Sequence, residues 1–236
     1  KCIHFWRIGG KTMKTPTKTG KKAASTVTLK EQAYQAIREQ ILKNHLPSGT
    51  PLTEEQLSAA LNISRTPIRA ALQKLTYEKL TIQDATGHIF VSTITRKDVE
   101  NLTVLRARIE PLAIELASFP IDAEKIELLK KDCSVQSALV EEHPEDDYRY
   151  AILDTQFHTD IAALCDNSIL ADTFNYLAPT VIRVHILTGT LNPYKETAIE
   201  EHLELIHYLE RGKKDFAMLA LKEHVMQVGN RIMTSL

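Results

Sequence analysis

The sequence is poor in the features that mark several large protein classes. Cysteine occurs three times in 236 residues, as Cys2, Cys133 and Cys165, with no CxxC pair. This usage argues against a disulfide framework or a cysteine-based zinc site and fits a reducing cytosol. Aromatic residues make up only 6%, and alternating apolar and polar runs are scarce, so an all-β sandwich is not expected. No run approaches the roughly 18 apolar residues of a membrane span, and we expect no signal peptide because residues 1–10 lack an apolar core and a cleavage site. We therefore expect a cytoplasmic globular protein without a membrane partner.

Charge is distributed unevenly along the chain. Residues 1–94 contain 14 lysines and arginines against 6 aspartates and glutamates, whereas residues 95–236 contain 15 against 24. A basic first part beside an acidic remainder indicates that only the first part contacts a polyanion. A solvated basic arm would account for some of this excess. We expect residues 1–28 to be a disordered basic tail; Met13 is a candidate native start, which would make residues 1–12 non-native.

The predicted elements of residues 29–94 are three helices and a β-hairpin. Apolar periodicity predicts a helix over 29–43. Thr53 and Gln56 form a predicted capping box for a short second helix, and Ser64 is the predicted N-cap of a third. Short strands are expected at 80–82 and 89–91, joined by a turn.

The third predicted helix carries the DNA-binding chemistry. Its buried stripe leaves Arg65, Thr66 and Arg69 outward, and its N-terminus favours phosphate oxygens. Arginine can also form a bidentate contact with guanine O6 and N7. Ser64 at the start of the helix, with Gly87 and His88 at the hairpin tip, completes the predicted DNA-contacting set. The alternative is a plain helical pair with two surface arginines.

The stretch Tyr34–Val91 resembles the winged helix-turn-helix of the GntR family of bacterial transcription regulators. The resemblance rests on the Leu46-Pro47-Ser48-Gly49 turn, Leu52-Thr53-Glu54, and above all Ile63-Ser64-Arg65-Thr66-Pro67-Ile68-Arg69. One position departs from the pattern: some members carry a DNA-contacting arginine near Glu55, and glutamate cannot take that role.

Residues 95–236 are predicted to form an all-helical bundle. Thr95 and Asp98 form a capping box, after which Leu102, Leu105, Ile109, Leu112 and Leu116 recur at spacings of three and four. Further helices are expected at about 122–141, 147–165, 168–187, 195–211 and 213–233, which makes about six. The fold class is therefore mainly α, with a winged helix-turn-helix domain at 29–94 and a helical effector-binding and dimerisation domain at 95–236.

Four titratable residues occupy predicted inward positions of this bundle. Asp154 and His158 are spaced i and i+4 on one helix, and His202 and His224 lie on the apolar faces of two others. Burying such groups unpaired is costly, and a bundle core can bind metal in this manner. The N/O ligand set suits a divalent transition metal, zinc first, with nickel, manganese or iron as alternatives. A set of hydrogen-bonded core histidines is the competing explanation. His185 has no partner at ligand spacing and is set aside.

The second part of the chain resembles the FCD effector domain of the FadR subfamily. The markers are Leu105-Arg106 with Ile109-Glu110, Asp154-Thr155-Gln156-Phe157-His158, Glu201-His202, and Ala217 through His224. The metal-containing branch uses an Asp-x-x-x-His pair and two later histidines, which the four residues above match. The resemblance also implies an effector-contacting arginine at Arg106, with Arg183 as a second candidate. Arg106 could instead simply pair with Glu110.

Together these features predict a metabolite-responsive transcriptional regulator, a repressor rather than an enzyme. A homodimer would place two winged helices on a pseudo-palindromic operator, and a small carboxylate would bind at the metal as effector. Two alternatives stay open: a metal-dependent hydrolase with an appended DNA-binding domain, and a regulator whose metal is purely structural.

Overall fold

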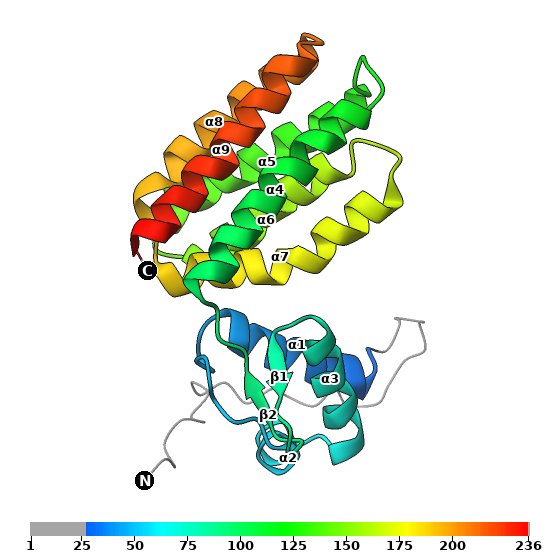
Figure 1. Cartoon of the computed structure of the whole chain (residues 1–236), viewed down its shortest axis with the longest axis vertical. Helices are drawn as coiled ribbons and strands as arrows, with labels where there is room; N and C mark the ends of the chain where they lie inside the picture. The colour runs from blue at the N-terminus through cyan, green and yellow to red at the C-terminus, as the bar shows by residue number, and fades with distance from the viewer. Residues whose placement is uncertain (1–26, 236) are drawn as a thin grey trace, which may run out of the picture.

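A computed structural model describes residues 27–235. The predicted tail at residues 1–28 and Cys2 therefore lie almost wholly outside the described part. The chain folds into two units, a small winged helix below a larger helical bundle (Figure 1). Its elements are α1 Leu29–Leu42, α2 Glu54–Leu61, α3 Arg65–Tyr77, β1 Thr81–Gln83, β2 Ile89–Val91, α4 Arg96–Leu116, α5 Ala123–Glu142, α6 Asp147–Ala162, α7 Ser168–Thr188, the 3-10 helix η1 Asn192–Tyr194, α8 Lys195–Glu210 and α9 Lys214–Ser235.

The first unit is a winged helix-turn-helix. The α1 and α3 helices bury their apolar stripes against each other, with Ile37, Ile68 and Leu72 at 1% exposure or less. The β1 and β2 strands pair antiparallel with Ile82 opposite Phe90. The predicted second strand is confirmed, and the first begins one residue later than expected.

The second unit is a six-helix bundle in the described chain, as predicted. The α4 and α9 helices pack along much of their length, which requires a close approach of their backbones. Gly229 of α9 allows it, since a Cβ atom there would lie 2.3 Å from Cγ2 of Thr103 on α4. The mainly α fold class is thus confirmed. No helix within residues 27–235 is both long enough and apolar enough to cross a bilayer.

Helix starts follow the predicted capping residues with two corrections. Thr95 and Asp98 form the complete capping box, with both reciprocal hydrogen bonds present. Thr53 accepts a hydrogen bond from the Gln56 amide, but no reciprocal bond closes a box. Ser64 stands at the N-cap of α3 without a side-chain cap hydrogen bond. The Ser64 side chain therefore does not satisfy the backbone N–H groups at this helix start.

Arg183 joins the two units. It lies on α7 at 1% exposure, and its guanidinium donates to the Ser92 hydroxyl (2.7 Å), the Ser92 carbonyl (2.5 Å) and the Ser48 hydroxyl (2.9 Å). Ser92 directly follows β2, and Ser48 belongs to the turn after α1. Burial lowers the pKa of Arg183 to about 10, so the side chain stays charged at neutral pH. One bundle side chain thus holds the wing and the α1 turn together.

Candidate functional site

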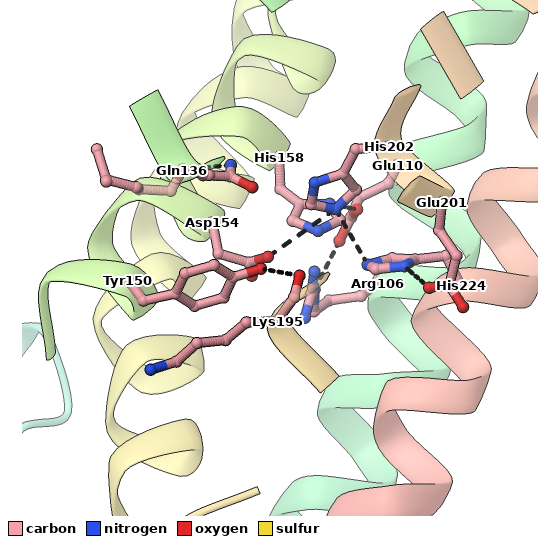
Figure 2. Close-up of polar contacts among 11 residues, drawn as sticks. Arg106, Glu110, Gln136, Tyr150, Asp154, His158, Lys195, Glu201, His202 and His224 are labelled. Carbon is pink, nitrogen blue, oxygen red and sulfur yellow. Dashed lines mark hydrogen bonds and ion pairs between the residues drawn. The ribbon is translucent and has the colours of Figure 1, made fainter. Parts of the chain in front are cut away.

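Three histidines meet in the interior of the bundle. His158 comes from α6, His202 from α8 and His224 from α9, and all three are at most 5% exposed. One ring nitrogen from each lies within 4.8 Å of the others. Asp154, one turn before His158, places Oδ1 3.9 Å from His202 Nε2 (Figure 2). The structure therefore brings together the four residues predicted as metal ligands, with the carboxylate at the edge of the histidine cluster.

Two buried or half-buried carboxylates set the orientation of two of these rings. Glu110 Oε2 lies 2.6 Å from His158 Nδ1, and Glu201 Oε2 lies 2.6 Å from His224 Nδ1. An ionised carboxylate only accepts, so each Nδ1 donates and each Nε2 keeps its lone pair. Carboxylate–histidine pairs of this kind orient metal-binding imidazoles.

Burial keeps two of the three histidines in the neutral state that a metal requires. Desolvation lowers the pKa of His202 well below its ordinary value, and it lowers the pKa of His224 as well. Burial works against the ionised form of Glu110, yet Arg106 and His158 outweigh it and lower that pKa to about 2. At neutral pH the result is neutral imidazoles at His202 and His224, with an ionised Glu110 carboxylate behind His158.

The donor set fits a transition metal. His158 Nε2 is buried and has no hydrogen-bond partner among the described residues. His202 Nε2 and His224 Nε2 lie 3.4 Å apart. Two nitrogens at zinc-ligand distance in a tetrahedral site are separated by roughly 3.3 Å. The residues that could hold the ion are therefore His158, His202 and His224, with Asp154 as the oxygen donor.

Arg106 lies beside this cluster and is engaged by Glu110. Its Nε donates to Glu110 Oε1 at 2.6 Å, and its guanidinium carbon lies 5.8 Å from the centre of the Phe174 ring. Arg106 therefore does pair with Glu110, as the alternative interpretation predicted, but the pair is buried in the bundle rather than exposed on its surface. Among residues 27–235 only Nε is hydrogen-bonded, which leaves the terminal nitrogens available to a ligand.

His185 is the site residue that sequence reasoning missed. It is 3% exposed, burial lowers its pKa to about 4, and its Nδ1 has no partner among residues 27–235. It lines both small cavities next to the cluster: one of about 20 Å³ shared with Asp154, and one of about 10 Å³ shared with Arg106. Because it stands alone on α7, no ligand spacing could reveal it.

Arg183 does not belong to this site. The structure places it at the junction with the winged helix, as described above, and its position does not suit the predicted effector role. A single residue, Val184, separates it from His185 on α7. This helix therefore contacts the histidine site with one side chain and the DNA-binding unit with another.

The predicted DNA-contacting residues occupy two places, the start of α3 and the hairpin tip. Arg65 and Arg69 are 62% and 64% exposed. At the tip, Asp84 accepts hydrogen bonds from the amides of Thr86 and His88, and Gly87 has a φ of +91°. That backbone conformation favours glycine, so the turn needs this residue for its shape.

Comparison with known proteins assigns the family. Residues 29–88 match the family described as bacterial regulatory proteins, gntR family, and residues 101–227 match the FCD domain. The second match alone spans more than half of the chain. The protein therefore belongs to the GntR family and carries an FCD domain, an architecture that fits the FadR subfamily. It is a transcriptional regulator, and regulators of this family bind operator DNA.

Similar proteins agree with this assignment. The HTH-type transcriptional repressor RspR of Escherichia coli (strain K12) is 26% identical over 207 residues, covering 88% of this chain and 90% of RspR. The gluconate operon transcriptional repressor of Bacillus subtilis (strain 168) is 29% identical over 225 residues, covering 92% and 88%.

Two solved structures share the fold. A GntR transcriptional regulator from Rhodococcus sp. RHA1 has a TM-score of 0.75 at 19% identity, covering 88% of this chain and 98% of that one. E. coli McbR/YncC has a TM-score of 0.73 at 20% identity, covering 89% and 99%. At these identities the likeness establishes the fold alone.

Proposed function

We propose that this protein is a cytoplasmic transcriptional repressor whose FCD domain binds a divalent metal, zinc first, and a small organic acid. The observation that carries the proposal is a cluster of three buried imidazoles whose ring nitrogens lie close together. Carboxylates orient two of these rings, and Nε2 of His158 has no hydrogen-bond partner among the described residues. The similarity to two repressors supports repression as the direction of control.

The metal would be held by Asp154, His158, His202 and His224. When bound it supplies a Lewis-acidic positive charge inside the bundle, to which an anionic oxygen can bind. The chain's own contribution is to keep the His202 and His224 imidazoles neutral through burial and to orient the His158 and His224 rings through Glu110 and Glu201. A set of only four protein ligands leaves open positions on a metal that prefers octahedral geometry.

A carboxylate is the effector chemistry that these surroundings favour. The terminal nitrogens of Arg106 have no hydrogen-bond partner in the described part of the chain, and a guanidinium fork matches a carboxylate. We place the acid between the metal and Arg106, with His185 as an additional hydrogen-bonding group. A hydroxy or sugar acid suits a site with several polar groups, and one relative is a repressor of a gluconate operon.

Effector binding between the metal and Arg106 must move helices, because the two cavities lined by His185 are too small to hold an acid. A volume of about 20 Å³ accommodates about one water molecule. An acid would push apart α4, α7 and α9, whose side chains line the two cavities. Because α7 also holds Ser92 and Ser48 through Arg183, its movement would reach the DNA-binding unit and change operator affinity.

A homodimer on a pseudo-palindromic operator is part of the proposal. Leu105, Leu112 and Leu116, which helped to predict α4, are 40%, 37% and 50% exposed. Their spacing leaves an apolar stripe on the outward face of α4, a helix that four residues separate from the wing. A self-complementary contact through this stripe would tie both winged helices to one assembly.

Metal analysis and titration calorimetry test the proposal. Chelator-treated protein is refed with zinc, nickel or manganese, and we expect about one ion per chain in the parent and much less in His202→Ala. Holo protein, stripped protein and Arg106→Lys, which keeps the charge beside Glu110, are then titrated with small carboxylic acids and uncharged sugars. Acid binding to holo protein only is the expected result.

The same titrations decide between the alternatives. A metal that binds while no acid does would favour a purely structural ion. Acid binding that survives both metal removal and the Arg106 substitution would contradict the proposed pose. Both family matches are to regulatory domains, which weighs against the hydrolase alternative, and turnover assays on the full chain test that class directly.

A further inference from the structure

The outward arginine Arg69 of α3 is clamped by a carboxylate from α2. Its Nε lies 2.6 Å from Glu54 Oε1 and its Nη2 lies 2.8 Å from Glu54 Oε2, a two-point contact across the helix-turn-helix. The arginine side chain is 64% exposed and Glu54 is 29% exposed. The neighbouring pair is looser, since Arg65 Nη2 lies 3.8 Å from Glu55 Oε2, beyond hydrogen-bond distance.

The clamp determines which edge of the guanidinium stays free. A guanidinium has five N–H donors, and Glu54 uses the one on Nε and one on Nη2. One hydrogen on Nη1 and the remaining one on Nη2 point along the side chain's own direction. This end-on fork is the edge that pairs with O6 and N7 of guanine in the major groove.

The clamping carboxylate also discriminates between ligands of Arg69. A DNA phosphate carries a full negative charge, so a phosphate close to Arg69 would meet like-charge repulsion from Glu54. A guanine edge presents two acceptors without net charge. Glu54 therefore disfavours contacts of Arg69 with the DNA phosphate backbone relative to contacts with bases. It also holds the Arg69 side chain in one conformation, which lowers the entropy cost of a base contact.

We propose that Glu54 is a positioning residue that holds Arg69 for end-on recognition of one guanine in each operator half-site. The inference rests on the DNA-recognition role of α3 and adds a determinant of base specificity on α2. It predicts that the affinity for the cognate sequence and the affinity for unrelated DNA respond differently to the loss of Glu54. Removing the carboxylate weakens binding to the cognate sequence, while binding to unrelated DNA stays constant or tightens because a negative charge near the duplex is lost.

The test compares two DNA probes at one salt concentration. The first is a duplex selected by the parent protein from a random library, and the second is a scrambled duplex of the same length and composition. Full-length parent, Glu54→Gln and Arg69→Ala are measured on both, with Glu55→Gln as the matched control. Each guanine of the selected duplex is then replaced in turn to map base discrimination.

We expect Glu54→Gln to weaken binding to the selected duplex about 5- to 10-fold without weakening binding to the scrambled one. The penalty for replacing one particular guanine should shrink in Glu54→Gln and vanish in Arg69→Ala. In the Arg69→Ala background Glu54→Gln should cause no further loss. Glu55→Gln should shift both probes in the same direction. Circular-dichroism melting verifies that each variant is folded.

Two results would overturn the inference, and they are distinguishable from failure of the recognition helix. If Glu54→Gln binds both probes more tightly by equal factors, the carboxylate is only a repulsive charge. If it weakens both equally, its role is structural. If Arg69→Ala itself leaves the selected duplex unaffected, the assignment of Arg69 to DNA recognition fails, and the role of Glu54 fails with it.

Discussion

Glu110 connects Arg106, the proposed acid-binding residue, to His158, a proposed metal ligand. Its substitution is therefore the sharpest perturbation that the structure suggests. The side chain is 0% exposed, and its two oxygens are each 2.6 Å from a partner, Oε1 from Arg106 Nε and Oε2 from His158 Nδ1. Glu110→Gln preserves the shape but leaves one acceptor oxygen for two donors. The amide group must then face a guanidinium or an imidazole N–H, and the charge of Arg106 loses its partner in the interior.

The expected cost follows from that geometry. Breaking a buried ion pair by neutralising one member costs about 3–5 kcal/mol, and glutamine keeps one of the two hydrogen bonds, so we expect about 3 kcal/mol. For a protein of this size, this corresponds to a fall in Tm of roughly 6–12 °C. Metal affinity should also fall about 10- to 100-fold, because His158 loses the group that fixes its ring.

Differential scanning calorimetry of metal-free protein at neutral pH measures the first effect, and zinc titration measures the second. Glu115→Gln, an exposed position on the same helix, is the control and should stay within about 2 °C of the parent. The double variant Arg106→Met with Glu110→Gln should recover part of the stability, because no unpaired charge remains. A Tm of Glu110→Gln within about 2 °C of the parent would refute the reasoning.

Three further predictions concern separate parts of the molecule. Burial and the neighbouring Asp160 raise the pKa of Asp132 to about 7, so ionisation of Asp132 destabilises the fold as pH rises from about 4 to about 7. The free energy of unfolding of Asp132→Asn should exceed that of the parent by about 1 kcal/mol above pH 7 and equal it near pH 4, as measured by chemical unfolding at both pH values. Leu112→Arg should convert a dimer to a monomer in sedimentation velocity, whereas Leu203→Arg, at an exposed position of α8, should not; a dimer that survives Leu112→Arg excludes the α4 stripe as its interface. Arg65→Ala should weaken binding to a selected duplex by about 1–3 kcal/mol with an unchanged Tm, and parent-like binding at matched salt would remove Arg65 from the recognition surface.

Local signals in the sequence were sufficient for the elements and for much of the site. Helical periodicity, Gly and Pro breaks and the Thr95–Asp98 capping box depend on residues at most four positions apart, so helix bounds could be predicted within a few residues. The inward positions of His158, His202 and His224 followed from the same periodicity, since a polar residue on an apolar face is visible without knowledge of the neighbouring helix.

The tertiary structure decided what each face meets. Periodicity indicates that a side chain lies on a given face, but it carries no information about which of several helices covers that face. Glu110 reaches His158 across 48 residues, and Arg183 reaches Ser92 across 91 and Ser48 across 135. Arg183 could therefore be placed at the effector site as reasonably as at the domain junction. The same ambiguity hid His185, and it left open that the leucines of α4 face outward. Contacts between segments distant in the chain arise from the packing of all six helices together, and no window of sequence contains them.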